Sequence, residues 1–290
     1  MKLITVLKLG RISNLPTIWT NVFVGVALSG VAFNYCFLLL PAIAISFVYL
    51  AGMYFNDIFD AEWDVKHNQP RPIALGEATI SEVRVLGCIW LALAFLILLF
   101  ASPVARLIYV LPSAFILVAL IMLYDWKHKH WADSGKTIGP WVMGACRMWV
   151  YFTVAAMLGA WNWQLLAAGV CLCVYIAGIT YVAKSEHLNE LNHKWPLLLL
   201  LAPYLLACFI AYNDVYTWLF VALGLLNLYI ATGYLKAERR NVPLAVGSLL
   251  AGITLVDASL LMALGYSALA LVALAACGLC LVLQRYVSAS

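Results

Sequence analysis

Charged residues are scarce in this chain of 290 residues: Asp, Glu, Lys and Arg make up 10% of it, whereas 66% of the residues are hydrophobic. Soluble domains usually carry roughly 25% charged residues. The mean hydropathy of +0.97 agrees with this shortage of charge. The composition excludes a soluble enzyme, a disordered chain and a nucleic-acid-binding protein. We therefore expect an integral membrane protein in the lipid bilayer, and nothing in the sequence indicates a protein partner.

Long polar segments are also missing. A membrane-spanning helix needs about 20 apolar residues, and apolar stretches of that order cover residues 16–33, 39–57, 79–101, 104–124, 137–158, 162–183, 195–212, 215–235, 243–264 and 267–284. The last stretch is short and rich in small residues, so the sequence predicts an all-α transmembrane bundle of nine or ten spans. Because no linker or low-complexity segment interrupts the chain, we expect residues 1–290 to form a single domain.

The eight cysteines lie mostly within these apolar stretches and have no nearby histidine to complete a metal site. Disulfides would be typical of a small secreted domain, which this composition excludes. We therefore interpret the cysteines as small apolar side chains within the helices.

Positive charges gather on one side of the predicted membrane, as cytoplasmic connections usually collect Lys and Arg. With the N-terminus inside, all but two of the 17 Lys and Arg residues fall at cytoplasmic ends of the stretches. The exceptions are Arg106, in a short outer turn, and Arg147, within the fifth stretch. We expect a cytoplasmic N-terminus, no cleaved signal peptide, and chemistry on the cytoplasmic side, where the longest connections lie.

Four acidic residues lie close together at the inner end of the second stretch, between Asn56 and Asp64. If the helix continues, Asp57, Asp60 and Asp64 lie at positions i, i+3 and i+7, on one face. Like charges on one helix face repel each other, so a cation is expected beside them. Oxygen ligands without Cys or His favour Mg²⁺ or Ca²⁺, and Mg²⁺ commonly shares its remaining positions with substrate phosphates. A solvated helix end is the alternative.

Basic residues follow the acidic cluster in the same connection. Lys66 comes two residues after Asp64, and Arg71 opens the segment R-P-x-x-x-G. Cations beside an acidic metal cluster indicate a bound polyanion, and Arg can bind a phosphate through two hydrogen bonds. A simple positive-inside flank would explain the same two charges.

The second long inner connection adds Tyr124, Lys127 and Lys129. His128 and His130 lie in the same segment and are possible metal ligands, but no third histidine accompanies them. This connection is therefore expected to contribute cations rather than a metal site.

The run from Asn56 to Gly76 reads N-D-x-x-D-x-x-x-D followed by R-P-x-x-x-G. At this place after the second apolar stretch, it resembles the first aspartate-rich motif of the UbiA family of intramembrane prenyltransferases. The likeness extends over most of the chain. Residues 11–17, the segment that begins with Tyr124, and the Gly and Arg pattern of residues 139–147 resemble further parts of that family.

The resemblance implies a helical bundle around a central cavity that opens to the cytoplasmic side and to the bilayer. In that family, Mg²⁺ held by two aspartate-rich motifs binds an isoprenyl diphosphate. The resemblance also implies roles for individual residues here. The carboxylates of Asp57, Asp60 and Asp64 would hold Mg²⁺, Arg71 with Lys127 or Lys129 would neutralise the departing diphosphate, and Asn56, Lys66 and Tyr124 would lie beside the substrate.

The chain departs from the family after the sixth stretch, where a second aspartate-rich motif is normal. The segment from Tyr181 to Glu190 contains no aspartate. Glu186 and Glu190 lie one helical turn apart and are candidate metal ligands, and Lys184 is a candidate direct contact to the diphosphate. An ordinary polar connection is the alternative. This altered motif resembles the EboC-like branch of the family, found in bacterial secondary-metabolite gene clusters. The resemblance implies a location in a bacterial inner membrane.

Arg147 and Asp257 lie within apolar stretches, where an ionised group costs at least about 2.5 to 3.5 kcal/mol on insertion scales. Such groups usually face the interior of a helical bundle. Arg147 is a candidate contact for the diphosphate or the acceptor, and Asp257 a candidate partner for a cation or a proton. The structural alternative is that the two pair with each other or with Asn21, Asn227 or Thr180. Asn21 is also a candidate substrate contact.

These features favour a Mg²⁺-dependent enzyme that transfers an isoprenyl group from a prenyl diphosphate to a hydrophobic acceptor, aromatic or lipid. The alternative is a non-catalytic relative that binds an isoprenoid or metabolite and helps it across the membrane. The degenerate segment from Lys184 to Glu190 is what keeps this alternative open.

Overall fold

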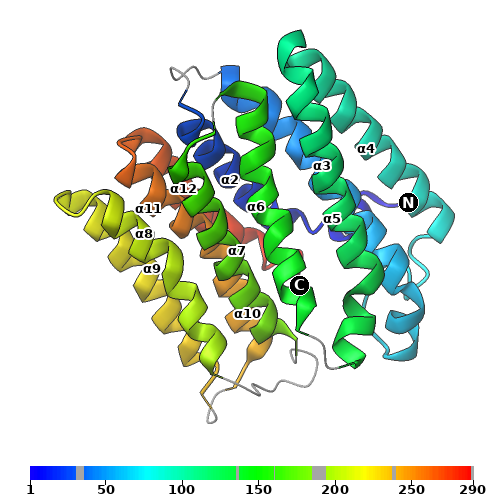
Figure 1. Ribbon diagram of the computed structural model, residues 1–290. Coiled ribbons are helices and arrows are strands. Elements are labelled where there is room, and N and C mark those ends of the chain that lie inside the picture. The colour runs from blue at the N-terminus through cyan, green and yellow to red at the C-terminus, as the bar shows by residue number, and fades with distance from the viewer. Residues whose placement is uncertain (31–35, 135–136, 160, 185–193, 237–239, 289–290) are drawn as a thin grey trace.

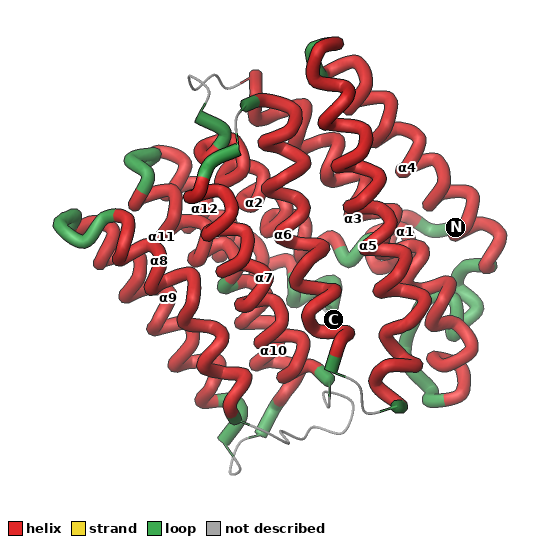
Figure 2. The backbone as a smooth tube through the Cα atoms, viewed as in Figure 1, coloured by secondary structure: helices red, strands yellow, loops and turns green. Residues whose placement is uncertain are grey.

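The computed structural model describes residues 1–30, 36–134, 137–159, 161–184, 194–236 and 240–288, and this part of the chain is helical without strands (Figure 2). The helices stand side by side as a bundle (Figure 1). Their bounds are α1 Leu3–Leu9, η1 Ile12–Asn14, α2 Leu15–Leu28, α3 Cys36–Lys66, α4 Ile80–Ala101, η2 Val104–Arg106, α5 Leu107–Asp133, α6 Ile138–Leu158, α7 Trp163–Ala183, η4 Trp195–Leu201, α8 Ala202–Ile210, α9 Val215–Gly233, α10 Val242–Ala251, α11 Ile253–Ala263 and α12 Ser267–Leu283.

Each of the ten predicted apolar stretches contains helix. Seven segments in the described part are long and apolar enough to cross a membrane: Leu38–Lys66, Ile80–Ala101, Val104–Ala132, Ile138–Leu158, Trp163–Ala183, Val215–Gly233 and Val242–Ala263. The other three stretches correspond to the shorter apolar helices Ile12–Leu28, Trp195–Ile210 and Ser267–Leu283. The chain is thus an integral, multi-pass membrane protein, and nine or ten as the number of spans stays a prediction.

Polar side chains mark where several helices begin. Thr79 and Glu82 form a capping box at the start of α4, in which each side chain bonds the backbone N–H of the other. Asn162 caps α7 by accepting from the N–H of Leu165, and Asp214 caps α9 by accepting from the N–H groups of Tyr216 and Thr217. These caps satisfy backbone groups that a helix end would otherwise leave unpaired.

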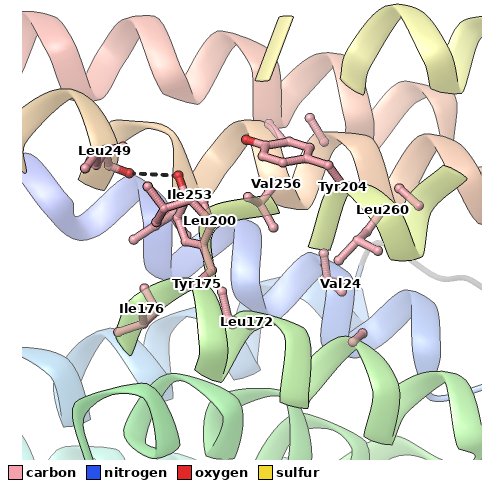
Figure 3. Packing of buried hydrophobic residues seen from close by; sticks show 14 of the residues in the cluster. Val24, Leu172, Tyr175, Ile176, Leu200, Tyr204, Leu249, Ile253, Val256 and Leu260 are labelled. Carbon is pink, nitrogen blue, oxygen red and sulfur yellow. Dashed lines mark hydrogen bonds between the residues drawn. The ribbon is translucent and has the colours of Figure 1, made fainter. Parts of the chain in front are cut away.

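The main core lies between α2, α6, α7 and the helices from α8 to α12. Figure 3 shows its centre, where the hydroxyl of Tyr175 donates to the backbone carbonyl of Leu249 at 3.2 Å. The apolar side chains around this bond come from helices far apart in the sequence. The seven cysteines that the structure describes in detail are free, in agreement with their interpretation as packing residues.

Helices α6 and α7 pack with almost no space between their backbones at Gly144. A Cβ atom there would clash with the backbone carbonyl oxygen of Cys173. The glycine of the 139–147 segment therefore has a packing role, since it lets α6 approach α7. This close approach places Arg147, one turn further along α6, at a fixed position in the bundle.

Candidate functional site

A cavity of about 770 Å³ lies among α2, α3, α5, α6, α7 and α10. The segment around Arg11 forms part of its wall, together with Ser288, which follows α12. Its walls differ in character. One part is apolar and includes Ile45, Leu117 and Ile176, whereas the part beside the end of α3 carries most of the charged side chains.

Helix α3 continues without interruption through the acidic cluster to Lys66. Its carboxylates are therefore stacked along one side of the helix, and Asp57, Asp60 and Asp64 are all buried. Asp60 and Asp64 line the cavity together with Asn56, whereas Asp57 lies behind this wall. The helix thus presents two carboxylates and one amide to the cavity.

Arg11 neutralises Asp57 from the turn between α1 and η1. Its Nη2 donates to Asn56 Oδ1 at 2.9 Å and to Asp57 Oδ1 at 3.3 Å. Burial is the largest single influence and opposes the charged form of Arg11, but the surrounding negative groups, Asp57 foremost and then Tyr49, Asp60 and Asp125, together outweigh it, so the pKa of Arg11 is raised. The backbone of Arg11 has a φ of 39°, a left-handed conformation that is costly for a residue with a Cβ. The fold therefore tolerates backbone strain to bring this guanidinium to the cavity.

Asp60 lies beside two basic side chains of α5. His128 Nε2 lies 3.3 Å from Asp60 Oδ1, and Lys129 Nζ lies 3.5 Å from Asp60 Oδ2. The same ammonium group lies 3.8 Å from the centre of the Trp63 ring. Lys129 is thus held between an acid and an aromatic ring at the cavity wall.

Arg71 reaches the cavity from a tight turn after α3. The N–H of Leu75 donates to the carbonyl of Arg71 at 2.9 Å, and Gly76 closes the turn with a φ of 71°. This backbone requirement explains the glycine of R-P-x-x-x-G. The neighbouring charge of Arg11, together with burial, lowers the pKa of Arg71 to about 10. Two guanidinium groups that repel each other beside one cavity favour a bound anion between them.

Other predicted residues fall into three groups. Tyr124 and Lys184 line the cavity. Lys66 is exposed at the end of α3, and Lys127 lies over the ring of Trp126, so neither lines the cavity. Glu186 and Glu190 lie outside the described residues.

Sequence reasoning did not single out Arg11 or Asp125 as site residues, and it named His128 as a possible metal ligand rather than as a partner of Asp60. Asp125 is buried at the cavity, accepts from Asn56 Nδ2 at 3.1 Å through Oδ1, and has no hydrogen-bond partner at Oδ2 in the described part of the chain. Its signal was present in the sequence, since Asp125 directly follows Tyr124 within an apolar helix. Arg11 and His128 carried no comparable signal, because a cation at a cytoplasmic helix end is common.

Arg147 lies on the cavity wall formed by α6, with its guanidinium carbon 5.9 Å from the centre of the Tyr49 ring. Its Nη1 donates to Asn21 Oδ1 at 3.0 Å. Asn21 in turn donates to Asp257 Oδ2 at 2.8 Å. Arg147 and Asp257 are therefore connected through Asn21, as the structural alternative expected, and Asn21 and Asp257 are wholly buried behind the wall.

The donor set fits Mg²⁺ only in part. In the described residues, no three His, Cys, Asp or Glu side chains come together closely enough to hold a metal ion. Asp60 and Asp64 nevertheless offer carboxylate oxygens to the cavity, with Asp60 Oδ1 also 3.3 Å from His128 Nε2. Because Mg²⁺ often binds one or two carboxylates and completes its shell with water and substrate phosphates, these residues fit an ion shared with a bound phosphate.

Comparisons with known proteins bear on the fold. No family model matches the chain, and no curated protein matches it in sequence. A solved structure described as a UbiA homologue from Aeropyrum pernix K1 superposes with a TM-score of 0.62 at 17% identity, covering 87% of this chain and 97% of that one. A structure of digeranylgeranylglyceryl phosphate synthase in membranes gives a TM-score of 0.60 at 20% identity, covering 91% and 98%. The chain therefore has the UbiA fold.

Proposed function

We propose that this protein is a Mg²⁺-dependent prenyltransferase that moves an isoprenyl group from a prenyl diphosphate to a hydrophobic acceptor, a lipid or an aromatic compound. The UbiA fold supports this at the level of architecture, because one structure that shares it is a digeranylgeranylglyceryl phosphate synthase. The observation that carries the proposal is one cavity in which Asp60 and Asp64 face Arg71 and Lys129 beside an apolar wall.

The charged end of the cavity suits the diphosphate. Arg71 and Lys129 are placed to donate to its oxygens, and Lys184 lines the same cavity from the end of α7. Preplaced cations stabilise the negative charge that grows on a leaving group. The apolar wall suits the isoprenyl chain and keeps water from the reacting carbon.

The reaction needs one bond to break and one to form. The C1–O bond of the prenyl diphosphate breaks with its electron pair on the diphosphate, a nucleophilic atom of the acceptor bonds to C1, and the acceptor gives up its proton. Tyr49, Trp63 and Tyr124 line the cavity, and their rings can face positive charge at C1. The side chains thus bind the leaving group and exclude water rather than form a covalent intermediate.

Mg²⁺ would be held by Asp60 and Asp64, with Asp57 behind them, and bound there it would supply further positive charge to the diphosphate oxygens. We place this end of the cavity on the cytoplasmic side of a bacterial inner membrane, with the N-terminus on that side as well. The positive charges of the connections support this orientation. The altered segment after α7 supports a place in the EboC-like branch.

Incubation with labelled prenyl diphosphates tests the proposal. Membranes that carry the protein should convert geranyl, farnesyl or geranylgeranyl diphosphate into a labelled lipid-soluble product with Mg²⁺ and not with excess EDTA. The Asp60→Asn variant should lose this conversion, because the amide cannot hold Mg²⁺ as the carboxylate does.

The matched control is Glu62→Gln, which removes an exposed acid from the same helix and should leave conversion unchanged. If no prenyl diphosphate of any length is converted, or if conversion is the same in EDTA, the enzyme proposal is wrong. Tight binding of a prenyl diphosphate without conversion would instead favour the binding or translocating alternative.

A further inference from the structure

Three side chains from three helices form a continuous polar connection behind the cavity wall. Arg147 comes from α6, Asn21 from α2 and Asp257 from α11. Arg147 Nη1 donates to Asn21 Oδ1 at 3.0 Å, and Asn21 Nδ2 donates to Asp257 Oδ2 at 2.8 Å. We call this connection the Asp257 relay.

The chemistry of the two ends determines the orientation of the asparagine. A guanidinium group can only donate hydrogen bonds, and an ionised carboxylate can only accept them. The amide of Asn21 carries one acceptor and one donor, so only one of its two orientations satisfies both neighbours. Arg147 and Asp257 therefore both favour the same orientation of Asn21, and the carboxylate of Asp257 fixes it from the side opposite Arg147.

The hydrogen bonds around Asp257 support the ionised form. Thr20 Oγ1 donates to Asp257 Oδ2 at 2.5 Å, and the Tyr151 hydroxyl donates to Oδ1 at 2.6 Å. With Asn21, three donors converge on a carboxylate that is 0% exposed. A buried charge needs such partners, and the negative charge of Asp257 offsets that of Arg147 inside the membrane.

The same arrangement occurs a second time on the same cavity. Arg11 Nη2 donates to Asn56 Oδ1 at 2.9 Å, and Asn56 Nδ2 donates to Asp125 Oδ1 at 3.1 Å. Again a cavity-lining arginine is connected through one asparagine to a buried aspartate of another helix. Arg11 forms an ion pair with Asp57 of the acidic cluster, whereas Arg147 forms no ion pair with a carboxylate of that cluster within the described residues.

We propose that Asp257 is a positioning residue that acts through Asn21 to hold the Arg147 guanidinium in one orientation toward the cavity. Arg147 then offers its remaining N–H groups, beside Tyr49, to an anionic group of a bound substrate. The use of Arg147 by a substrate rests on the proposed prenyl transfer, whereas the relay itself does not.

Two isosteric variants test the relay. Asp257→Asn keeps the shape of the side chain but removes the charge, and its amide no longer requires a donor from Asn21. The double variant Asn21→Asp with Asp257→Asn exchanges the two side chains, so that a carboxylate accepts directly from Arg147 and the total charge is unchanged. Thr153→Val is the matched control, because it removes a different buried hydrogen bond of α6, the 3.0 Å contact with Ser113.

The first measurement needs no substrate. Protein labelled with ¹⁵N-arginine in nanodiscs should show side-chain N–H signals of Arg147 that exchange slowly with water, assigned by their loss in Arg147→Lys. We expect Asp257→Asn to abolish this protection and the exchange variant to restore it, with Thr153→Val unchanged. Protection that persists in Asp257→Asn, fails to return in the exchange variant, or is also lost in Thr153→Val contradicts the relay.

The second measurement is turnover with geranylgeranyl diphosphate and a membrane lipid extract. Loss of a hydrogen bond to a charged group corresponds to about a 10- to 150-fold effect, so Asp257→Asn should lower kcat/KM by about tenfold or more. The exchange variant should recover most of the loss, and equal loss in both variants contradicts the positioning role. If the native protein transfers no prenyl group, the proposed function is wrong. Hydrogen exchange of the Arg147 side-chain N–H groups then tests by itself whether Asp257 positions Arg147.

Discussion

Arg71 and Arg11 bring two guanidinium groups to the charged end of the cavity from segments far apart in the sequence. Their proximity is costly, since the charge of Arg11 lowers the pKa of Arg71 to about 10. Similar groups are brought together at sites for polyanions, where a ligand relieves their repulsion. Binding of the proposed diphosphate between the two groups would relieve this repulsion.

Replacement of Arg71 tests this view. Arg71→Gln should weaken binding of a prenyl diphosphate by about 1.5 to 3 kcal/mol, the range for a hydrogen bond to a charged group. Calorimetric titration of the purified protein with geranylgeranyl diphosphate measures the change. Lys66→Gln, an exposed cation from the same segment, should have little effect. Equal weakening by both variants would show that net charge, and not contact, is responsible.

Lys184 stands at the edge of the altered second motif and lines the cavity. If it contacts the diphosphate directly, Lys184→Ala should weaken binding by about 1.5 to 3 kcal/mol even at saturating Mg²⁺. The same titration in a series of Mg²⁺ concentrations measures this, with the exposed Lys194→Ala as control. An effect that disappears when Mg²⁺ is raised would point instead to a metal site in the neighbouring segment.

At the scale of elements, glycines determine how two key segments lie. Gly76 closes the turn that carries Arg71, and its φ of 71° disfavours any residue with a Cβ. No other atom lies within 4 Å of a Cβ at this position. Gly76→Ala should therefore destabilise the protein only through the left-handed backbone conformation, by about 1 to 2 kcal/mol. Diphosphate affinity and thermal stability should both fall slightly, and an unchanged Tm would mean that the turn adapts freely.

The contact between α6 and α7 at Gly144 permits less adjustment, because the clashing atom belongs to the backbone of Cys173. Gly144→Ala should destabilise the protein by about 1 to 3 kcal/mol, as overpacked sites do. The fraction that survives heating, measured by size-exclusion chromatography in detergent, reports the change. Gly278→Ala in α12 is the control, since a Cβ there meets nothing within 4 Å, and it should be neutral or stabilising.

At the scale of the whole molecule, the charged part of the cavity is lined by the ends of α3, α5 and α7 and the starts of α6 and α10, which share one side of the bundle. Single cysteines at Lys66, His130 and Arg240 should therefore react with an impermeant thiol reagent from one side of the membrane, and those at Trp161 and Asn213 from the other. All five residues are exposed, so failure to react would reflect sidedness rather than burial. Labelling that mixes the two groups would overturn the arrangement of the spans. A background without the exposed Cys88 avoids a competing signal.

The sequence by itself determined the membrane environment, the helical class and the acidic face of α3. These properties depend on composition and on local periodicity, which is why the spacing of Asp57, Asp60 and Asp64 was enough to assign them to one helix face. The apolar stretches also located every helix from α2 onwards, because about 20 apolar residues in a row have few alternatives in a bilayer. They missed the extensions of α3 to Lys66 and of α5 to Asp133, where charged residues continue the helix beyond its apolar part, and the division of residues 243–264 into α10 and α11.

Only the tertiary structure decided which charges meet. The pairing of Arg11 with Asp57, of His128 with Asp60, and of Arg147 with Asp257 through Asn21 joins residues from different helices. Hydrophobicity determines that a helix lies in the membrane, but not which face it turns to which neighbour. That choice depends on close packing, such as the approach of α6 to α7 at Gly144, and on the satisfaction of every buried charge, and both are properties of the assembled bundle.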